Sequence, residues 1–107
     1  MMGLFEKLRR PDINQGLEEF KATPGALLLD VRSRSEYAGG HIPGSRNLPL
    51  KELEGVEEIA PEKETPVFVY CQSGGRSGQA RRELQSMGYT HVRDLGGIHF
   101  YSGELKR

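Results

Sequence analysis

Hydrophobic residues gather in short continuous runs, separated by segments with a helical spacing of apolar positions. The runs at 26–31 (ALLLDV) and 66–70 (PVFVY) are rich in Leu, Val, Phe and Tyr. Such unbroken runs are typical of strands that are buried on both faces. A shorter run at 91–95 (HVRDL) has the same character. These three segments predict strands of a sheet that is covered on both sides.

Between the runs, apolar residues recur three or four positions apart, as on one face of an amphipathic helix. The predicted helices cover 15–21, 33–37, 50–60 and 75–87. Ser33 stands where an N-cap belongs, and Gly88 stands where a C′ residue belongs, with Tyr89 expected to pack back on Leu84. Strands alternating with helices imply right-handed crossovers, so we expect an α/β fold with a mostly parallel sheet.

Length and composition describe one ordinary globular domain. The chain has 107 residues, with 36% hydrophobic and 28% charged residues and a net charge of zero. This balance predicts neither a nucleic-acid partner nor a membrane partner. Residues 1–11 carry a short apolar stripe before Pro11, so we expect a helical N-terminal extension followed by a single domain over 12–107.

The cysteine and histidine content argues against a disulfide or a metal site. Cys71 is the only cysteine, so it has no intramolecular partner and cannot build a multi-thiolate zinc site. His41, His91 and His99 are scattered along the chain. The N-terminus lacks the pattern of a signal peptide, and no apolar stretch is long enough to span a bilayer. We therefore expect a reducing compartment, the cytoplasm, and no metal or other cofactor.

The clearest chemical signal is the stretch VFVYCQSGGRS at 67–77, where a strand turns into a helix. A helix N-terminus and a nearby cation both favour the thiolate form of a cysteine, and Arg76 supplies the cation. Gly74 and Gly75 let the backbone curl so that its N–H groups point inward as an anion nest. An inert cysteine packed at a strand end is the alternative interpretation. It does not account for the glycines, arginine and serine that follow at once, so we favour a nucleophile.

These residues resemble a known family, the rhodanese-like domain of the single-domain type. The match extends over roughly 12–101 and has three parts in order: LLLDVRSRSEYAGGHIPGSRNLPL, the loop VFVYCQSGGRS, and DLGGI. The resemblance implies a three-layer fold with a mostly parallel sheet of about five strands flanked by helices. It also implies sulfur transfer through a cysteine persulfide, with a small sulfur-containing substrate, and it allows a protein as sulfur donor or acceptor.

By this resemblance, Cys71 is the catalytic nucleophile. The loop residues expected to bind the transferred sulfur are Gln72, Ser73, Gly74, Gly75, Arg76 and Ser77. Asp30 and Arg32 match the Asp-x-Arg pair of the family and are expected to brace the walls of the site. Glu36, His41 and Asn47 also match motif positions and are expected to make structural hydrogen bonds.

Two departures from the family pattern stand out. Some members that favour thiosulfate place cations just after the cysteine, where this chain has the uncharged Gln72 and Ser73. The tryptophan that members often carry after Gly-Gly-Ile is absent, and Tyr101 is expected to pack in its place. The first departure weakens the attraction for a dianion and leaves the donor open.

Two other functions are compatible with the same loop. Cysteine-dependent phosphatases and arsenate reductases use a related loop, but the spacing here is C-x4-R, one residue shorter than the phosphatase pattern. A smaller ring of N–H groups favours one sulfur atom over a tetrahedral phosphate, and no general acid for an alcohol leaving group is evident. A non-enzymatic interaction module is the third possibility, against which the intact Cys71 and Arg76 argue.

Overall fold

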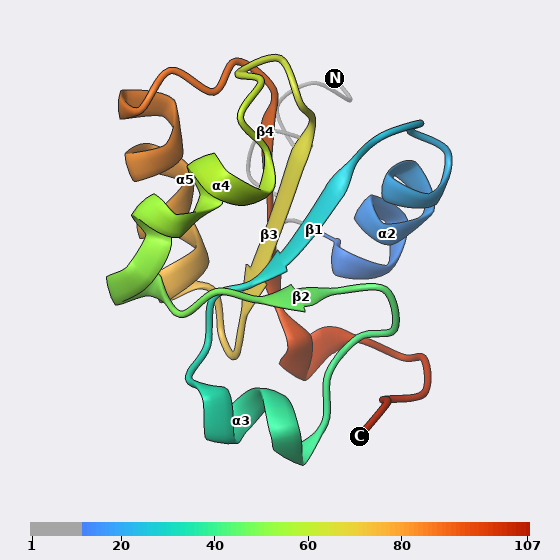
Figure 1. Cartoon of the computed structure of the whole chain (residues 1–107). Helices are drawn as coiled ribbons and strands as arrows, with labels where there is room; N and C mark the ends of the chain where they lie inside the picture. Colours follow the sequence, from blue (N-terminus) through green and yellow to red (C-terminus); the bar gives the residue numbers. More distant parts are fainter. Residues whose placement is uncertain (1–11) are drawn as a thin grey trace, which may run out of the picture.

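A parallel sheet forms the centre of the protein, with helices on both of its faces (Figure 1). The computed structural model describes residues 12–107, so the helix expected within 1–11 lies outside the described residues. In chain order the elements are α2 (Ile13–Lys21), β1 (Leu27–Asp30), α3 (Arg34–Gly39), β2 (Arg46–Asn47), the 3-10 helix η1 (Leu50–Gly55), α4 (Val56–Ile59), β3 (Val67–Cys71), α5 (Gly75–Ser86), β4 (Val92–Gly97) and the 3-10 helix η2 (Ile98–Phe100).

The sheet order is β2-β1-β3-β4, and each of the three pairings is parallel. The α/β class predicted from the alternating pattern is therefore confirmed. Within residues 12–107 the sheet has four strands rather than the five or so expected. β2 contributes only two residues, because the chain turns into η1 three residues after Asn47.

The strand β3 is buried along its whole length and divides the core in two. Val69 and Cys71 face one hydrophobic cluster, whereas Phe68 and Tyr70 face the other, as the two-residue period of a strand requires. The first cluster is completed by Leu53, Val56, Ala80 and Leu84 from η1, α4 and α5, and the second by Ile13 and Leu17 from α2.

Two strand ends differ from the sequence-based prediction in a way that matters for the site. Cys71 is the last residue of β3, one residue beyond the predicted segment 66–70, and β4 continues to Gly97, two residues beyond the predicted segment 91–95. The reason is that Gly97 pairs with Cys71 across the two strands. A Cβ atom at Gly97 would lie 2.5 Å from the carbonyl oxygen of Gln72, so only glycine permits this approach.

The predicted helix ends are confirmed by their capping contacts. Ser33 caps α3 in a capping box, in which its hydroxyl accepts the N–H of Glu36 and the Glu36 carboxylate accepts the N–H of Ser33. After α5, Gly88 has a φ of 104° and the N–H of Tyr89 donates to the carbonyl of Leu84 at 3.1 Å. The N-terminus of α3 and the C-terminus of α5 are therefore fixed by local contacts.

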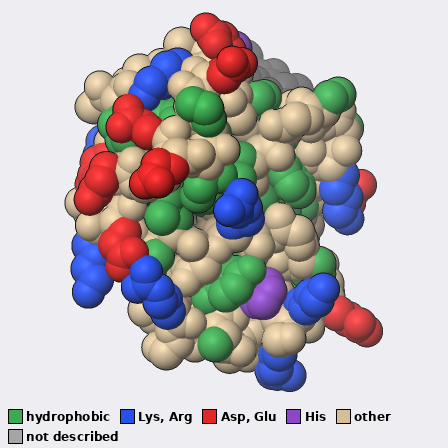
Figure 2. Space-filling view, in the orientation of Figure 1, with side chains coloured by type: hydrophobic (Ala, Val, Ile, Leu, Met, Phe, Trp, Pro, Cys, Tyr) green, Lys and Arg blue, Asp and Glu red, His purple; other side chains and the backbone are tan. Residues whose placement is uncertain are grey.

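The surface carries charges of both signs. In Figure 2, acidic side chains gather over η1 and α4, with lysines and arginines spread over the rest of the visible face. Among the helices of the described part of the chain, none combines the length and the apolar character needed to cross a membrane.

The buried hydroxyl of Tyr70 holds the turn at 41–45 against the sheet. It accepts the N–H of Ile42 at 3.1 Å and lies 3.0 Å from the hydroxyl of Ser45. Tyr70 is fully buried, and its burial raises the pKa of the phenol, which therefore stays neutral. We expect Tyr70→Phe to lower the free energy of unfolding by about 1–3 kcal/mol, because the Ile42 N–H loses its partner.

Urea denaturation followed by circular dichroism measures this loss. The matched control is Tyr101→Phe, which removes a hydroxyl that donates to the carbonyl of Glu104 in an exposed hydrogen bond. A Tyr70→Phe protein as stable as this control would contradict the role assigned to the buried hydroxyl.

Candidate active site

The sulfur of Cys71 lies at the N-terminus of α5, held by backbone N–H groups. Three residues, 72–74, connect β3 to α5, and Gly74 takes a left-handed conformation with a φ of 112°. The N–H of Gly74 donates to the Cys71 Sγ at 3.0 Å, and the N–H of Ser77 donates to it at 3.2 Å. The first N–H groups of a helix have no partner within the helix, so here the sulfur satisfies two donors at the start of α5.

The thiol is packed as well as hydrogen-bonded. Only 1% of Cys71 is exposed, and it belongs to the core cluster that includes Ala80 of α5. The hydroxyl oxygen of Ser77 lies 3.5 Å from the sulfur and donates to the carbonyl of Gly74 at 3.1 Å. The two interpretations of Cys71 are thus not exclusive: the side chain is buried at a strand end, and amides of the loop and of the helix start point at its sulfur.

Asp30 and Arg32 form a buried ion pair at the end of β1. The guanidinium donates to both carboxylate oxygens of Asp30, at 2.7 Å for the shortest contact. Burial opposes the charge of Arg32, but the hydrogen bonds and negative charge of Asp30 outweigh it, so the pKa of Arg32 is raised. Arg32 also donates to the carbonyl of Gly40 at 2.7 Å and to the side chain of Gln72 at 3.3 Å. It therefore links β1, the end of α3 and the loop after Cys71.

Arg76 is held by a carboxylate rather than left open to an anion. Its two terminal nitrogens donate to the two carboxylate oxygens of Glu36, at 2.7 and 3.0 Å. This hydrogen-bonded pairing lowers the pKa of Glu36 to about 2. The guanidinium thus contacts α3, because the crossover after β1 brings Glu36 beside the loop.

The other motif residues make hydrogen bonds within the protein. The side-chain amide of Asn47 donates to the carbonyls of Asp30 and Arg32, both at 3.0 Å. His41 pairs with the backbone of Lys106 and stacks on Tyr37 with 3.7 Å between ring centroids. Both contacts agree with the structural roles expected for these residues. Among residues 12–107, no group of three His, Cys, Asp or Glu side chains comes together in a way that could hold a metal ion.

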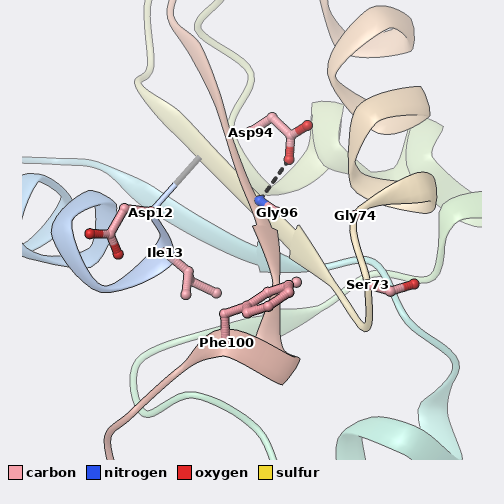
Figure 3. Close-up of a pocket in the computed structure, with 8 residues that line it drawn as sticks. Asp12, Ile13, Ser73, Gly74, Asp94, Gly96 and Phe100 are labelled. Carbon is pink, nitrogen blue, oxygen red and sulfur yellow. Dashed lines mark hydrogen bonds between the residues drawn. The ribbon is translucent and has the colours of Figure 1, made fainter. Parts of the chain in front are cut away.

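The sequence reasoning missed the support behind the loop. The N–H of His99 donates to the carbonyl of Gln72 at 3.2 Å, and the carboxylate of Asp94 accepts the N–H of Gly96 at 2.9 Å (Figure 3). These contacts fix the end of β4 beneath the loop. In the sequence, only the segment DLGGI pointed to this region, and it did not indicate which residues the end of β4 would contact.

A pocket opens on this side of the loop, with a volume of about 570 Å³. Its walls come from the start of α2, the end of β4, the loop residues Ser73 and Gly74, and Phe100 of η2. Figure 3 shows the ring of Phe100 between Ile13 and this loop. Tyr101 packs against the second core cluster, as expected for the position of the missing tryptophan.

Comparison with known proteins agrees with this architecture. Residues 13–103 match the family described as Rhodanese-like domain. The chain is 44% identical over 92 residues to the Uncharacterized protein YqhL of Bacillus subtilis (strain 168), covering 83% of this chain and 71% of YqhL. It is 45% identical over 71 residues to the Thiosulfate sulfurtransferase PspE of Escherichia coli (strain K12), covering 65% of this chain and 68% of PspE.

Solved structures give the same result. The Human Single Domain Sulfurtranferase TSTD1 superposes with a TM-score of 0.73 and 32% identity, covering 87% of this chain and 96% of that chain. The match of most of the chain to the family, together with the loop from β3 to α5, leads to one conclusion: this protein belongs to the rhodanese-like domain family.

Proposed function

We propose that this protein transfers a sulfane sulfur from a donor such as thiosulfate to a thiol or cyanide, through a persulfide on Cys71. The observation that carries the proposal is the pair of N–H groups, from Gly74 and Ser77, that point at the Cys71 sulfur. Relatives that are named thiosulfate sulfurtransferases support sulfurtransferase activity in general and small sulfur-containing substrates.

The proposed reaction has two steps. The Cys71 thiolate attacks the outer sulfur of thiosulfate, the S–S bond of the donor breaks, and sulfite leaves with the bonding pair. Amide donors and the positive end of the α5 dipole stabilise the negative charge, which lies on the Cys71 sulfur before this step and on the transferred sulfur after it. An acceptor thiolate or cyanide then attacks the terminal sulfur and restores the Cys71 thiolate, which is a ping-pong scheme.

The other site residues have supporting roles in this proposal. The pair Asp30–Arg32 braces the loop through Gln72, and the Gln72–Ser77 backbone surrounds the transferred sulfur. A protein partner could supply or accept the sulfur in place of a small molecule. A cytoplasmic location remains a prediction, based on the single free thiol.

The pairing of Arg76 with Glu36 disfavours phosphoryl transfer. A phosphate monoester would need the guanidinium fork for its oxygens, and both terminal nitrogens already donate to a carboxylate. We therefore expect hydrolysis of an aryl phosphate by the wild type to be no faster than by Cys71→Ser. A chromogenic phosphate assay measures this, and turnover that depends on Cys71 would favour a phosphatase instead.

Loading of sulfur on Cys71 is the direct test of the proposal. After incubation with thiosulfate and removal of the excess, the intact protein should have gained the mass of one sulfur atom. The Cys71→Ser protein should gain none. An unchanged mass for the wild type, or the same gain in mass for both proteins, would contradict the persulfide mechanism.

The amide cradle can be tested at Gly74, whose positive φ an alanine disfavours. We expect Gly74→Ala to slow sulfur loading on the order of tenfold, because its N–H shifts away from the sulfur and a charge-assisted hydrogen bond is lost. Stopped-flow or quenched mass measurements give the rate.

Gly25→Ala is the matched control. Gly25 also has a positive φ, and neither glycine has an atom within 4 Å of an added Cβ, but Gly25 lies in the α2–β1 connection, at the opposite end of the sheet (Figure 1). Both variants should lose about 1 kcal/mol of stability from backbone strain. Equal loading rates in the two variants would contradict the role of the Gly74 amide.

A further inference from the structure

Four charged side chains surround the loop after Cys71 and cancel one another in pairs. Asp30 closes on Arg32, and Glu36 closes on Arg76, with contacts of 2.7 Å in each pair. The two pairs also interact across the site, since the negative charges that act on Arg76 include Asp30 and a Cys71 thiolate as well as Glu36. The walls of the site thus bring no net positive charge to the sulfur.

Glu36 is fixed in its position by its own helix. Its carboxylate accepts the Ser33 N–H at 2.9 Å in the capping box of α3, while both of its oxygens accept from Arg76. Hydrogen bonds from Arg76 hold the pKa of Glu36 near 2, so the carboxylate is charged at any pH at which the enzyme would work. In Figure 1, α3 lies directly below the β3–α5 loop.

The loop and the described pocket beside Arg76 do not restore the missing positive charge. The first two loop residues, Gln72 and Ser73, are uncharged. The pocket beside Arg76 is lined by Lys51 but also by Glu54 and Glu83. The remaining source of positive potential is the N-terminus of α5, which is equivalent to roughly half a positive charge. The full negative charge of a Cys71 thiolate outweighs it.

We propose that the preferred sulfur donor carries at most one negative charge, as an alkyl persulfide does, and that Glu36 sets this preference against dianionic thiosulfate by neutralising Arg76. This inference rests on the proposed function, because it names the donor class of the same site. A dianion approaching the thiolate meets a like charge that the N-terminus of α5 offsets only in part, and it finds no free cation in the loop, so repulsion raises the barrier to its binding.

The sulfur transfer from such a donor balances without another reactant. The Cys71 thiolate attacks the terminal sulfur of R–S–SH, a Cys71 Sγ–S bond forms, and the S–S bond of the donor breaks. The thiolate RS⁻ leaves with the bonding pair and takes up the proton of the terminal sulfur. The products are RSH and the Cys71 persulfide anion, so no oxidant or reductant is needed.

The test measures the rate of sulfur loading on Cys71 with each of two donors separately, thiosulfate and hydroxyethyl persulfide. The Cys71→Ser protein gives the background rate. The wild type should have a higher kcat/KM with the persulfide than with thiosulfate. Preference for thiosulfate overturns the inference and leaves the persulfide mechanism intact. Failure of both donors to load Cys71 contradicts the proposed function itself.

Glu36→Gln separates a charge effect from a structural one. Glutamine keeps an acceptor for Arg76 and for the capping box but removes the negative charge. We expect kcat/KM for thiosulfate to rise on the order of tenfold, with a much smaller change for the persulfide. A residue that only braced the loop would lower both values together, and this outcome, or no change for thiosulfate, would refute the inference.

The control variant is Glu52→Gln, which removes a carboxylate from the neighbouring exposed pair with Arg34 and should change neither donor. If Glu36→Gln does not fold, the ionic-strength dependence of the wild type decides. Screening weakens repulsion between like charges, so kcat/KM for thiosulfate should rise with added salt. A decrease with salt would mean that an attractive field guides the dianion, and the inference would be wrong.

Discussion

The hydrogen bonds from two backbone N–H groups to the sulfur of Cys71 depend on the precise meeting of a strand and a helix. β3 must end at Cys71, and α5 must begin after three connecting residues, for the amides of Gly74 and Ser77 to reach one atom. The strand end is fixed by parallel neighbours on both sides, and the helix start is fixed by packing of Ala80 and Leu84 on the sheet. The sheet and its packed helix thus fix the position of the short connection between β3 and α5.

Ion pairs hold the residues around that turn in place, and because each pair is neutral they add no net charge. Arg32 joins the end of β1 to the loop, and Arg76 joins α5 to α3. Arg32 is neutralised by its neighbour Asp30, and Arg76 is neutralised by Glu36 across the contact. A buried pair such as Asp30–Arg32 adds little net stability, because desolvation offsets most of its attraction. Its value here is geometric, since Arg32 joins the end of β1 and the carbonyl of Gly40 to Gln72, which lies 40 positions further along the chain.

The sequence predicted the local features well because each depends on neighbouring residues. The strand before Cys71, the helix after it and the Ser33 cap all follow from short patterns. The pairing of Glu36 with Arg76 could not be predicted in this way, because their contact spans 40 positions and depends on how two crossovers pack. The same holds for the contact of His99 with Gln72, where backbone atoms meet and side-chain identity carries no signal.

The glycine at the end of β4 limits how this site could change during evolution. Gly97 lies so near the carbonyl of Gln72 that not even a methyl group fits between the two segments. A loop lengthened by one residue, to the size that phosphate requires, could not expand toward β4 unless that strand also withdrew. Enlargement of the loop in this direction would therefore need coordinated changes in two separate stretches of the gene, which a single insertion does not supply.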